Sequence, residues 1–185
     1  MAKTRQEALE ALLRSYSVWY DITRCNEADA PMVAQAAFHE QGTGYLLSKK
    51  AKMWGADRNE YVFLFSVPHL TEEAARRCIA QAQALGDEMI VPGKEHMCSY
   101  IVAEILCDTA DEAAVQAVRR YHRRKSFQFS LQGWTETHSA LVELGKDSIV
   151  ANPDGRLTAK FLKSALYPKP KRRGSVRKLS KKQGV

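Results

Sequence analysis

Hydrophobic side chains recur at helical spacing near the start of the chain. Leucine and aromatic residues occupy positions 9, 12, 13, 16, 19 and 20, which would place them along one side of a helix. Thr4 lies three residues before Glu7, which is the spacing of a capping box. The pattern therefore predicts an amphipathic helix over about residues 5–20, followed by a polar loop at residues 25–31.

Three strand-like runs come next, at residues 32–40, 44–54 and 60–67. The connections between them, QGT and GADRN, have the length and the turn residues of hairpin loops, so we expect an antiparallel meander. The third run, EYVFLFSV, is apolar on both faces, which predicts a central strand that is covered on both sides.

A second helix is predicted after the third run. Pro68 ends the strand, and Thr71 is a suitable N-cap because its side chain can accept a hydrogen bond from the first helical turn. The helix is expected to continue to about Leu85 and to end at Gly86 as a C-cap, before an irregular stretch at residues 87–97.

Strands and helices alternate in the remainder of the chain. Residues 99–107 predict a strand, and Thr109 with Glu112 has the capping-box spacing that would begin a helix over about residues 110–121. The further expected elements are strands near residues 127–131 and 137–144, a short strand or hairpin after Gly155, and a helical turn at residues 161–166. The order α-β-β-β-α-β-α-β-β predicts the α+β (mixed α/β) class, with helices packed on one main, mostly antiparallel sheet in a single domain of residues 1–167.

The net charge of the chain is concentrated at its C-terminal end. The chain has 28 Lys and Arg against 21 Asp and Glu, a net charge of +7, but residues 1–167 alone carry −1. Residues 168–185, the basic tail, hold eight basic residues and no acidic ones, with almost no apolar anchor, so we expect this segment to be disordered when free. Its basic residues are Lys169, Lys171, Arg172, Arg173, Arg177, Lys178, Lys181 and Lys182.

A tail of this kind predicts a polyanionic partner. Each phosphate that it neutralises releases counterions, so binding would weaken steeply with salt. We favour RNA or the ribosome over DNA, although the tail itself carries no sequence information and does not separate the two. A tail that only aids solubility is the alternative interpretation.

A second basic cluster lies inside the predicted domain, where a predicted helix ends. The structural interpretation is that its cations complement the negative end of that helix. The functional interpretation is that the cluster and the basic tail form one binding face, on which Tyr121, Phe127 and Trp134 offer rings for unpaired bases. Aromatic residues at such positions more often belong to a core. The cluster comprises Arg119, Arg120, His122, Arg123, Arg124 and Lys125.

Glu104 is the best single candidate for a catalytic residue. It lies in the middle of the apolar run SYIVAEILC, where a carboxylate needs either a partner or a raised pKa. An ion pair with a lysine or arginine of a neighbouring strand is the structural explanation, and a position in a cleft is the functional one. Glu136 and His138 lie two residues apart on a later strand and are expected to face the same cleft.

His96 and Cys98 form a weaker candidate. A histidine and a cysteine at this spacing can share a metal or act as base and nucleophile, with His122 as a second possible base. The spacing is not that of a known zinc site, so we predict neither a metal nor a cofactor. A hydrogen-bonded histidine beside a buried thiol is the structural alternative.

Three sequence blocks resemble a known family. The blocks are KKAKMW…EYVFLFSV at residues 49–67, EHMCSYIVAEILC at residues 95–107 and KSFQFSLQGWTE at residues 125–136. Their order resembles a family of uncharacterised bacterial proteins in which an H-M-x-S-[YF] block precedes a K-S-F-x-F-x-x-x-G-W block. The resemblance spans about residues 5–150 and not the basic tail. Because that family has no assigned activity, the resemblance implies a bacterial cytoplasmic protein and no particular chemistry.

Several function classes are disfavoured by motifs that the sequence lacks. No segment approaches the roughly 18 apolar residues that span a bilayer, and the N-terminus has no apolar signal core, so we expect a cytoplasmic location. None of the four cysteines forms a C-x-x-C pair, which favours free thiols. Phosphate-binding, dinucleotide-binding, zinc-protease and nucleophile-elbow motifs are also missing.

The charge distribution thus favours a non-enzymatic accessory protein that contacts nucleic acid through its basic tail. The alternative from a different class is a small-molecule enzyme or ligand-binding domain. Its pocket would lie around Glu104, His96, His122 and His138.

Overall fold

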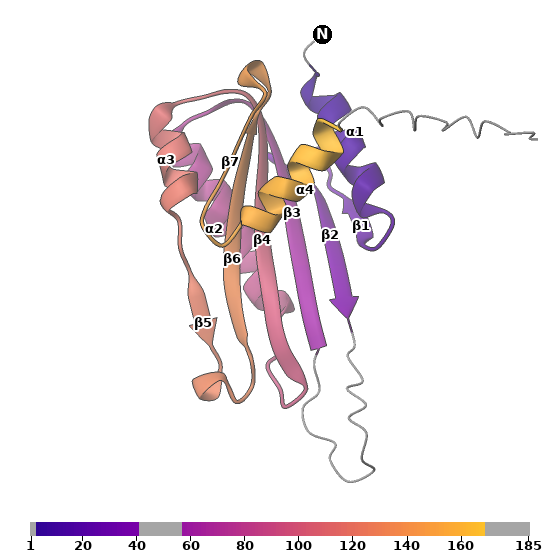
Figure 1. Cartoon of the computed structure of the whole chain (residues 1–185), viewed down its shortest axis with the longest axis vertical. Helices are drawn as coiled ribbons and strands as arrows, with labels where there is room; N and C mark the ends of the chain where they lie inside the picture. The colour runs from indigo at the N-terminus through magenta and orange to yellow at the C-terminus, as the bar shows by residue number, and fades with distance from the viewer. Residues whose placement is uncertain (1–2, 41–56, 169–185) are drawn as a thin grey trace, which may run out of the picture.

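The computed structural model describes residues 3–40 and 57–168. Over these ranges the chain forms one sheet with helices on both faces; the strand order is β1-β2-β3-β4-β6-β5, and β7 also pairs with β6 (Figure 1). In chain order the elements are α1 (Arg5–Tyr16), β1 (Asp21–Arg24), β2 (Met32–Glu40), β3 (Asp57–Leu70), α2 (Glu72–Met89), β4 (His96–Ala110), α3 (Glu112–Arg120), β5 (Arg124–Ser126), β6 (Trp134–Glu143), β7 (Ser148–Ala151) and α4 (Arg156–Leu166).

The strands at the centre of the sheet are parallel. β3 pairs with β4 and β4 pairs with β6 in parallel register, and α2 and α3 lie in the crossover connections that parallel strands require. The outer pairings β1–β2, β2–β3, β5–β6 and β6–β7 are antiparallel. The predicted α+β class is confirmed, and β3 is the central strand that its apolar sequence predicted.

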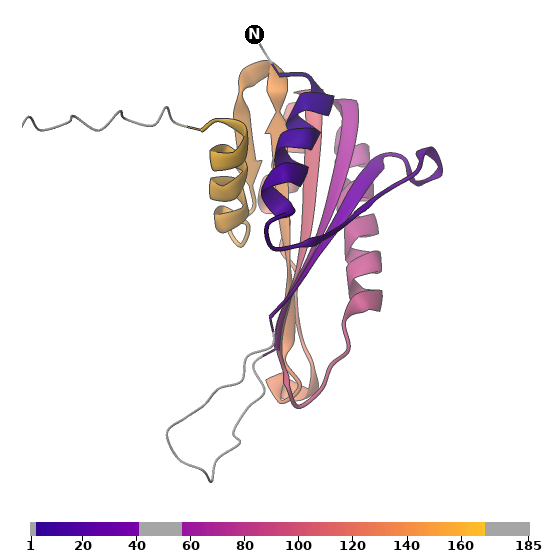
Figure 2. The same ribbon diagram turned by 90° about the vertical axis from the view of Figure 1, so that its right-hand side faces the viewer.

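Helices cover both faces of the sheet (Figure 2). Alternate residues of the central strands pack into two hydrophobic layers beneath them, because successive side chains of a strand point to opposite faces. Phe63 and Ile101 belong to the layer beneath α2 and α3. Leu64 and Val102 belong to the layer on the other face, where they meet Leu12 of α1 and residues of α4. Each fully buried aliphatic or aromatic side chain contributes about 1.5–3 kcal/mol to the free energy of folding. Both layers therefore stabilise the sheet.

Two helices begin where their capping residues predict. The Thr4 hydroxyl accepts a hydrogen bond from the Glu7 N–H, and the Glu7 carboxylate accepts one from the Thr4 N–H, so the capping box is present. Thr71 caps α2 by accepting from the N–H of Ala74. α1 ends at Tyr16 rather than near residue 20, because the chain turns there toward β1.

Two further predicted helix boundaries were wrong. α2 passes through Gly86 and continues to Met89, so Gly86 is not a C-cap. Instead it lies buried against β4, where an added Cβ would come within 2.6 Å of Ile101 Cγ1, and its missing side chain lets helix and strand approach closely. The N-cap of α3 is Asp111 rather than Thr109, because Thr109 still belongs to β4.

The segment before β6 differs most from its prediction. Residues 127–131 do not form a strand, because residues 128–130 have φ angles of 44°, 53° and 70°, in the left-handed region that a strand excludes. Strand pairing is confined to the short β5 that precedes this turn. Gly133 closes the turn with a φ of +84°, and an added Cβ there would come within 2.3 Å of His96 Nδ1.

The chain forms α4 after Gly155, where a strand or hairpin was predicted, and the helical turn predicted at residues 161–166 is the second half of this helix. The predicted strand at residues 44–54 and the basic residues from Lys169 onward lie outside the described residues. Within the described ranges, no helix has the length and apolar character needed to cross a bilayer.

Candidate functional site

The candidate site lies on the half of the sheet that α1 and α4 leave uncovered. Both helices pack over the same face, near the end where β3, β4 and β6 finish, and the first halves of these strands extend beyond them (Figures 1 and 2). The side chains on that half are aromatic and charged rather than aliphatic. We call them the aromatic surface, which consists of Arg58, Glu60, Tyr100, Arg124, Trp134, Glu136 and His138.

The pairing register places most of these residues in two rows across the sheet. The row nearer the helices contains, in order, Glu60, Tyr100, Glu136 and Arg124. The next row contains Arg58, Cys98 and Trp134. Paired residues on adjacent strands point to the same face, so Tyr100 has a carboxylate on each side, whereas Trp134 lies between Cys98 and Ser126.

An arginine lies over each of the two large rings of the aromatic surface. The guanidinium carbon of Arg124 is 4.2 Å from the ring centroid of Trp134, and that of Arg58 is 5.0 Å from the centroid of Tyr100. The two rings contact each other edge to face, with centroids 5.6 Å apart. Both distances are within the range of cation–π attraction, which favours one orientation of each ring with a cation at its face.

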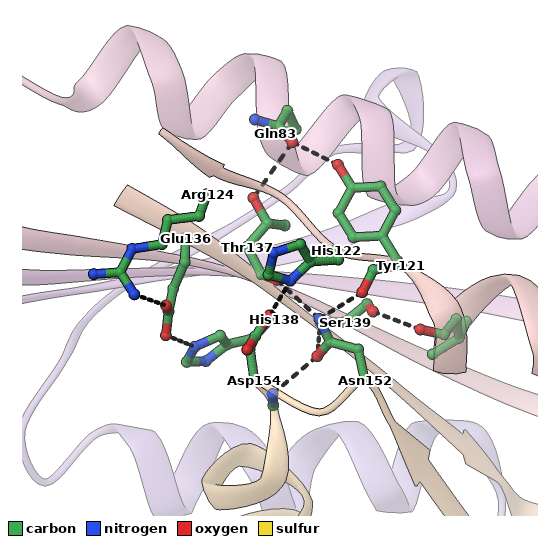
Figure 3. Close-up of polar contacts among 12 residues, drawn as sticks. Gln83, Tyr121, His122, Arg124, Glu136, Thr137, His138, Ser139, Asn152 and Asp154 are labelled. Atoms are coloured by element: carbon green, nitrogen blue, oxygen red, sulfur yellow. Dashed lines mark hydrogen bonds and ion pairs between the residues drawn. The ribbon is translucent and has the colours of Figure 1, made fainter. Parts of the chain in front are cut away.

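Glu136 is the polar centre of the aromatic surface (Figure 3). Its Oε1 accepts a hydrogen bond from His138 Nε2 at 3.0 Å, and its Oε2 is 4.0 Å from Nη1 of Arg124. The His138 ring in turn packs against Tyr100, with centroids 5.1 Å apart. Because the Glu136 side chain is 16% exposed, its carboxylate is held by neighbours and still reaches solvent.

Tyr100 and Cys98 both stay protonated at neutral pH. Burial is the main cause that raises the pKa of Tyr100 to about 12, and burial likewise raises the pKa of the Cys98 thiol. A buried, protonated thiol is a poor nucleophile. Cys98 is buried in the sheet, which agrees with the buried thiol of its structural interpretation.

His96 belongs to a different part of the molecule. It lines an open pocket of about 420 Å³ between the starts of β3 and β4 and the loop after α2. Its Nδ1 contacts the carbonyl oxygen of Gln132 at 2.9 Å and must donate there, which leaves Nε2 to accept from the Ser99 hydroxyl at 2.8 Å. Both ring nitrogens are thus occupied, and His96 fixes the turn before β6.

Glu104 lies beneath α1 and is completely buried. Its Oε1 accepts a hydrogen bond from the Tyr16 hydroxyl at 2.6 Å, and its Oε2 has no hydrogen-bond partner among the described residues. Burial raises the pKa of Glu104 to about 8; the Tyr16 bond opposes this shift and the nearby Glu60 adds to it. The predicted buried carboxylate is confirmed, but its partner is a tyrosine of α1 rather than a cation of a neighbouring strand.

The predicted basic cluster is divided among several environments. Arg119 and Arg120 lie exposed in the last turn of α3, where cations complement the helix end. Arg123 pairs with Asp87 of α2 at 2.8 Å. Arg124 is the member of the cluster that belongs to the aromatic surface.

The remaining members of the cluster lie outside the aromatic surface, and the basic tail begins away from the cluster. Lys125 lies over the Phe127 ring at 5.2 Å, and His122 pairs with Asp154 at 2.8 Å. α4 ends beside the start of α1, whereas β5 forms part of the opposite edge of the sheet (Figure 1). The described chain therefore does not bring the cluster and the origin of the tail to one side.

The four residues of the predicted small-molecule pocket are not gathered either. Glu104 lies under α1, His138 belongs to the aromatic surface, His96 lines the pocket beside α2, and His122 faces the loop before α4. Of these four residues, His96 alone lines the pocket beside α2, and both of its ring nitrogens are hydrogen-bonded.

Comparison with protein-family models matches residues 4–164 to a model described as a domain of unknown function, DUF8052. The chain belongs to the DUF8052 family. The expectation of an uncharacterised family is confirmed, while the two sequence blocks remain a prediction. No curated protein and no solved structure matches the DUF8052 chain.

Sequence reasoning found part of the aromatic surface of this DUF8052 domain. It named Arg124 and Trp134 as candidate binding residues, and it named Glu136 and His138 as neighbours. It missed Arg58, which lies in the connection predicted at residues 55–59, and Tyr100, which lies in the strand predicted at residues 99–107. These residues become a site only because β3, β4 and β6 are adjacent, and that pairing links segments distant in the chain.

Proposed function

We propose that the DUF8052 domain binds single-stranded nucleic acid, with RNA favoured over DNA, by stacking unpaired bases on its aromatic surface. The observation that supports this proposal is the pair of rings, Tyr100 and Trp134, on an uncovered half of a sheet with an arginine over each ring. RNA-binding sheets stack splayed bases on aromatic side chains and on guanidinium planes in this manner. An arginine that lies over a ring in the free protein can sandwich a base or turn toward a phosphate.

The energies indicate that the aromatic surface does not act alone. Stacking contributes about 1–3 kcal/mol per base, so two rings supply roughly 2–6 kcal/mol, whereas micromolar affinity needs about 8 kcal/mol. The surface carries as many carboxylates as arginines, and residues 1–167 have a net charge of −1. The basic tail is the natural source of the missing attraction to phosphates.

The Trp134→Ala variant is expected to bind a mixed-sequence ten-nucleotide RNA about 5- to 100-fold more weakly than the unaltered chain, because it loses one stacked base. Fluorescence anisotropy of a labelled oligonucleotide measures this change. Trp19→Ala is the matched control, since Trp19 is 73% exposed at the end of α1 and lies outside the aromatic surface. Equal affinities of the two variants would contradict the proposed site.

Replacing the eight basic residues of the tail with glutamine is expected to flatten the salt dependence of binding. The slope of log K against log salt falls by about 0.7 for each phosphate of a single strand that the variant no longer neutralises. A titration of the full-length variant and the unaltered chain at several salt concentrations measures the difference. An unchanged slope would assign the phosphate contacts to the domain and remove the tail from the proposal.

A further inference from the structure

We propose that Glu136 gives the aromatic surface a base preference, favouring guanine over uracil. This inference rests on the proposed single-strand binding and deepens it. The observation behind it is that the row through Tyr100 places a carboxylate on each side of the ring, Glu60 on β3 and Glu136 on β6. Adjacent strands lie about 4.8 Å apart, so the edge of a base stacked on Tyr100 falls over a neighbouring carboxylate.

Glu136 is the carboxylate that is set to receive that edge. The His138 bond fixes Oε1, and the described chain gives Oε2 no hydrogen bond, since the nearest arginine nitrogen is 4.0 Å away. Glu60 lies on the other side of Tyr100, near Tyr20, whose pKa is raised by burial first and then by Glu60. Oε2 of Glu136 therefore stays available beside Tyr100, and Oε1 has a second lone pair that can accept a further bond.

A carboxylate discriminates bases because it only accepts hydrogen bonds. Guanine presents a ring N–H next to an amino group, so it can donate two parallel bonds to one carboxylate, as a guanidinium does. Cytosine and adenine present an amino group alone. Uracil offers a single N–H between two carbonyl oxygens, and these oxygens would face the negative charge. Guanine is thus the favoured base and uracil the disfavoured one.

The test uses the full chain and two labelled RNA decamers, U₁₀ and UUGUUGUUGU. The unaltered protein is expected to bind the guanine-containing decamer about 5- to 100-fold more tightly, the range for one good base-edge pair. In Glu136→Gln, which keeps the size of the side chain and removes its charge, the ratio is expected to fall to about twofold. Glu73→Gln makes the same chemical change on the exposed face of α2, outside the aromatic surface, and is the matched control that is expected to keep the preference.

The outcomes separate this inference from the proposed function. Equal binding of the two decamers by the unaltered chain, or an undiminished preference in Glu136→Gln, would overturn the assignment to Glu136 and leave single-strand binding in place. Failure of both decamers to bind the unaltered chain would overturn both proposals. A thermal midpoint of Glu136→Gln close to that of the unaltered chain shows that the variant is folded.

Discussion

Replacing Asn152 with alanine is expected to lower the free energy of unfolding by about 3–5 kcal/mol, which is exceptional for one substitution. Asn152 is completely buried between β7 and α4, and its side chain uses its full hydrogen-bonding capacity. Oδ1 accepts from the N–H groups of Ser139 and Gly155, and Nδ2 donates to the carbonyl oxygens of Tyr121 and Thr137 (Figure 3). The substitution removes the side-chain partner of the Ser139 N–H and of the Tyr121 and Thr137 carbonyls, whereas the Gly155 N–H keeps its bond to the backbone carbonyl of residue 152.

Urea unfolding followed by circular dichroism measures this loss. Asn152→Asp is the informative companion variant, because it has nearly the same volume and keeps the oxygen that accepts from Ser139 and Gly155. Its second oxygen would face two carbonyl oxygens, so a buried charge would be repelled where the amide now donates. Near-normal stability of the aspartate variant would contradict the role assigned to the donor half of the amide.

The success of sequence reasoning here depends on how local each signal is. Thr4 and Thr71 mark the starts of α1 and α2 because a cap involves only the next three residues. The strand at residues 32–40 has the bounds that its sequence predicts. The burial of Glu104 also follows from its neighbours in the same strand. The residues around it are apolar on both faces of that strand, so neither face is expected to be exposed.

Features that depend on distant segments were not predictable in the same way. None of the three left-handed residues 128–130 is a glycine, so the sequence gives no direct signal for their conformation. The turn is held by His96 of β4, which donates a hydrogen bond to the carbonyl oxygen of Gln132. The parallel pairing of β4 with β6 depends on how α3 packs, although the strand–helix–strand order was a signal for a crossover. The aromatic surface could not be predicted for the same reason, since Tyr100 and Trp134 come into contact only through the pairing of β4 with β6.

The hydrogen bonds of Asn152 lie between these two cases. An asparagine three residues before a glycine is a local turn signal, and the bond from the Gly155 N–H to Oδ1 is of that kind. The other three side-chain bonds reach β6 and the end of α3, which the sequence places at no fixed distance. A residue whose sequence context is typical of an ordinary turn is therefore the main polar connection between α3, β6 and α4.

The Glu104→Gln variant is expected to be more stable than the unaltered chain at pH 8 and similar to it near pH 4.5. Burial raises the pKa of Glu104 from 4.5 to about 8, so the folded state holds its proton over a pH range in which the unfolded state has released it. Stability from this group is complete below about pH 4.5 and is lost as the pH rises toward 8. Each pKa unit corresponds to roughly 1.4 kcal/mol, so the loss reaches a few kcal/mol.

Glutamine resembles the protonated carboxyl group, because it is neutral and its oxygen still accepts from the Tyr16 hydroxyl. The difference in unfolding free energy between the variant and the unaltered chain, measured in urea at intervals from pH 4.5 to 8.5, isolates Glu104 from all the groups that the two proteins share. Glu73→Gln makes the same chemical change on the exposed face of α2, where the carboxylate is 77% exposed, and is expected to give a flat difference. A flat difference for Glu104→Gln as well would show that Glu104 ionises in the folded protein as it does in water, and that the contact with Tyr16 is open to solvent.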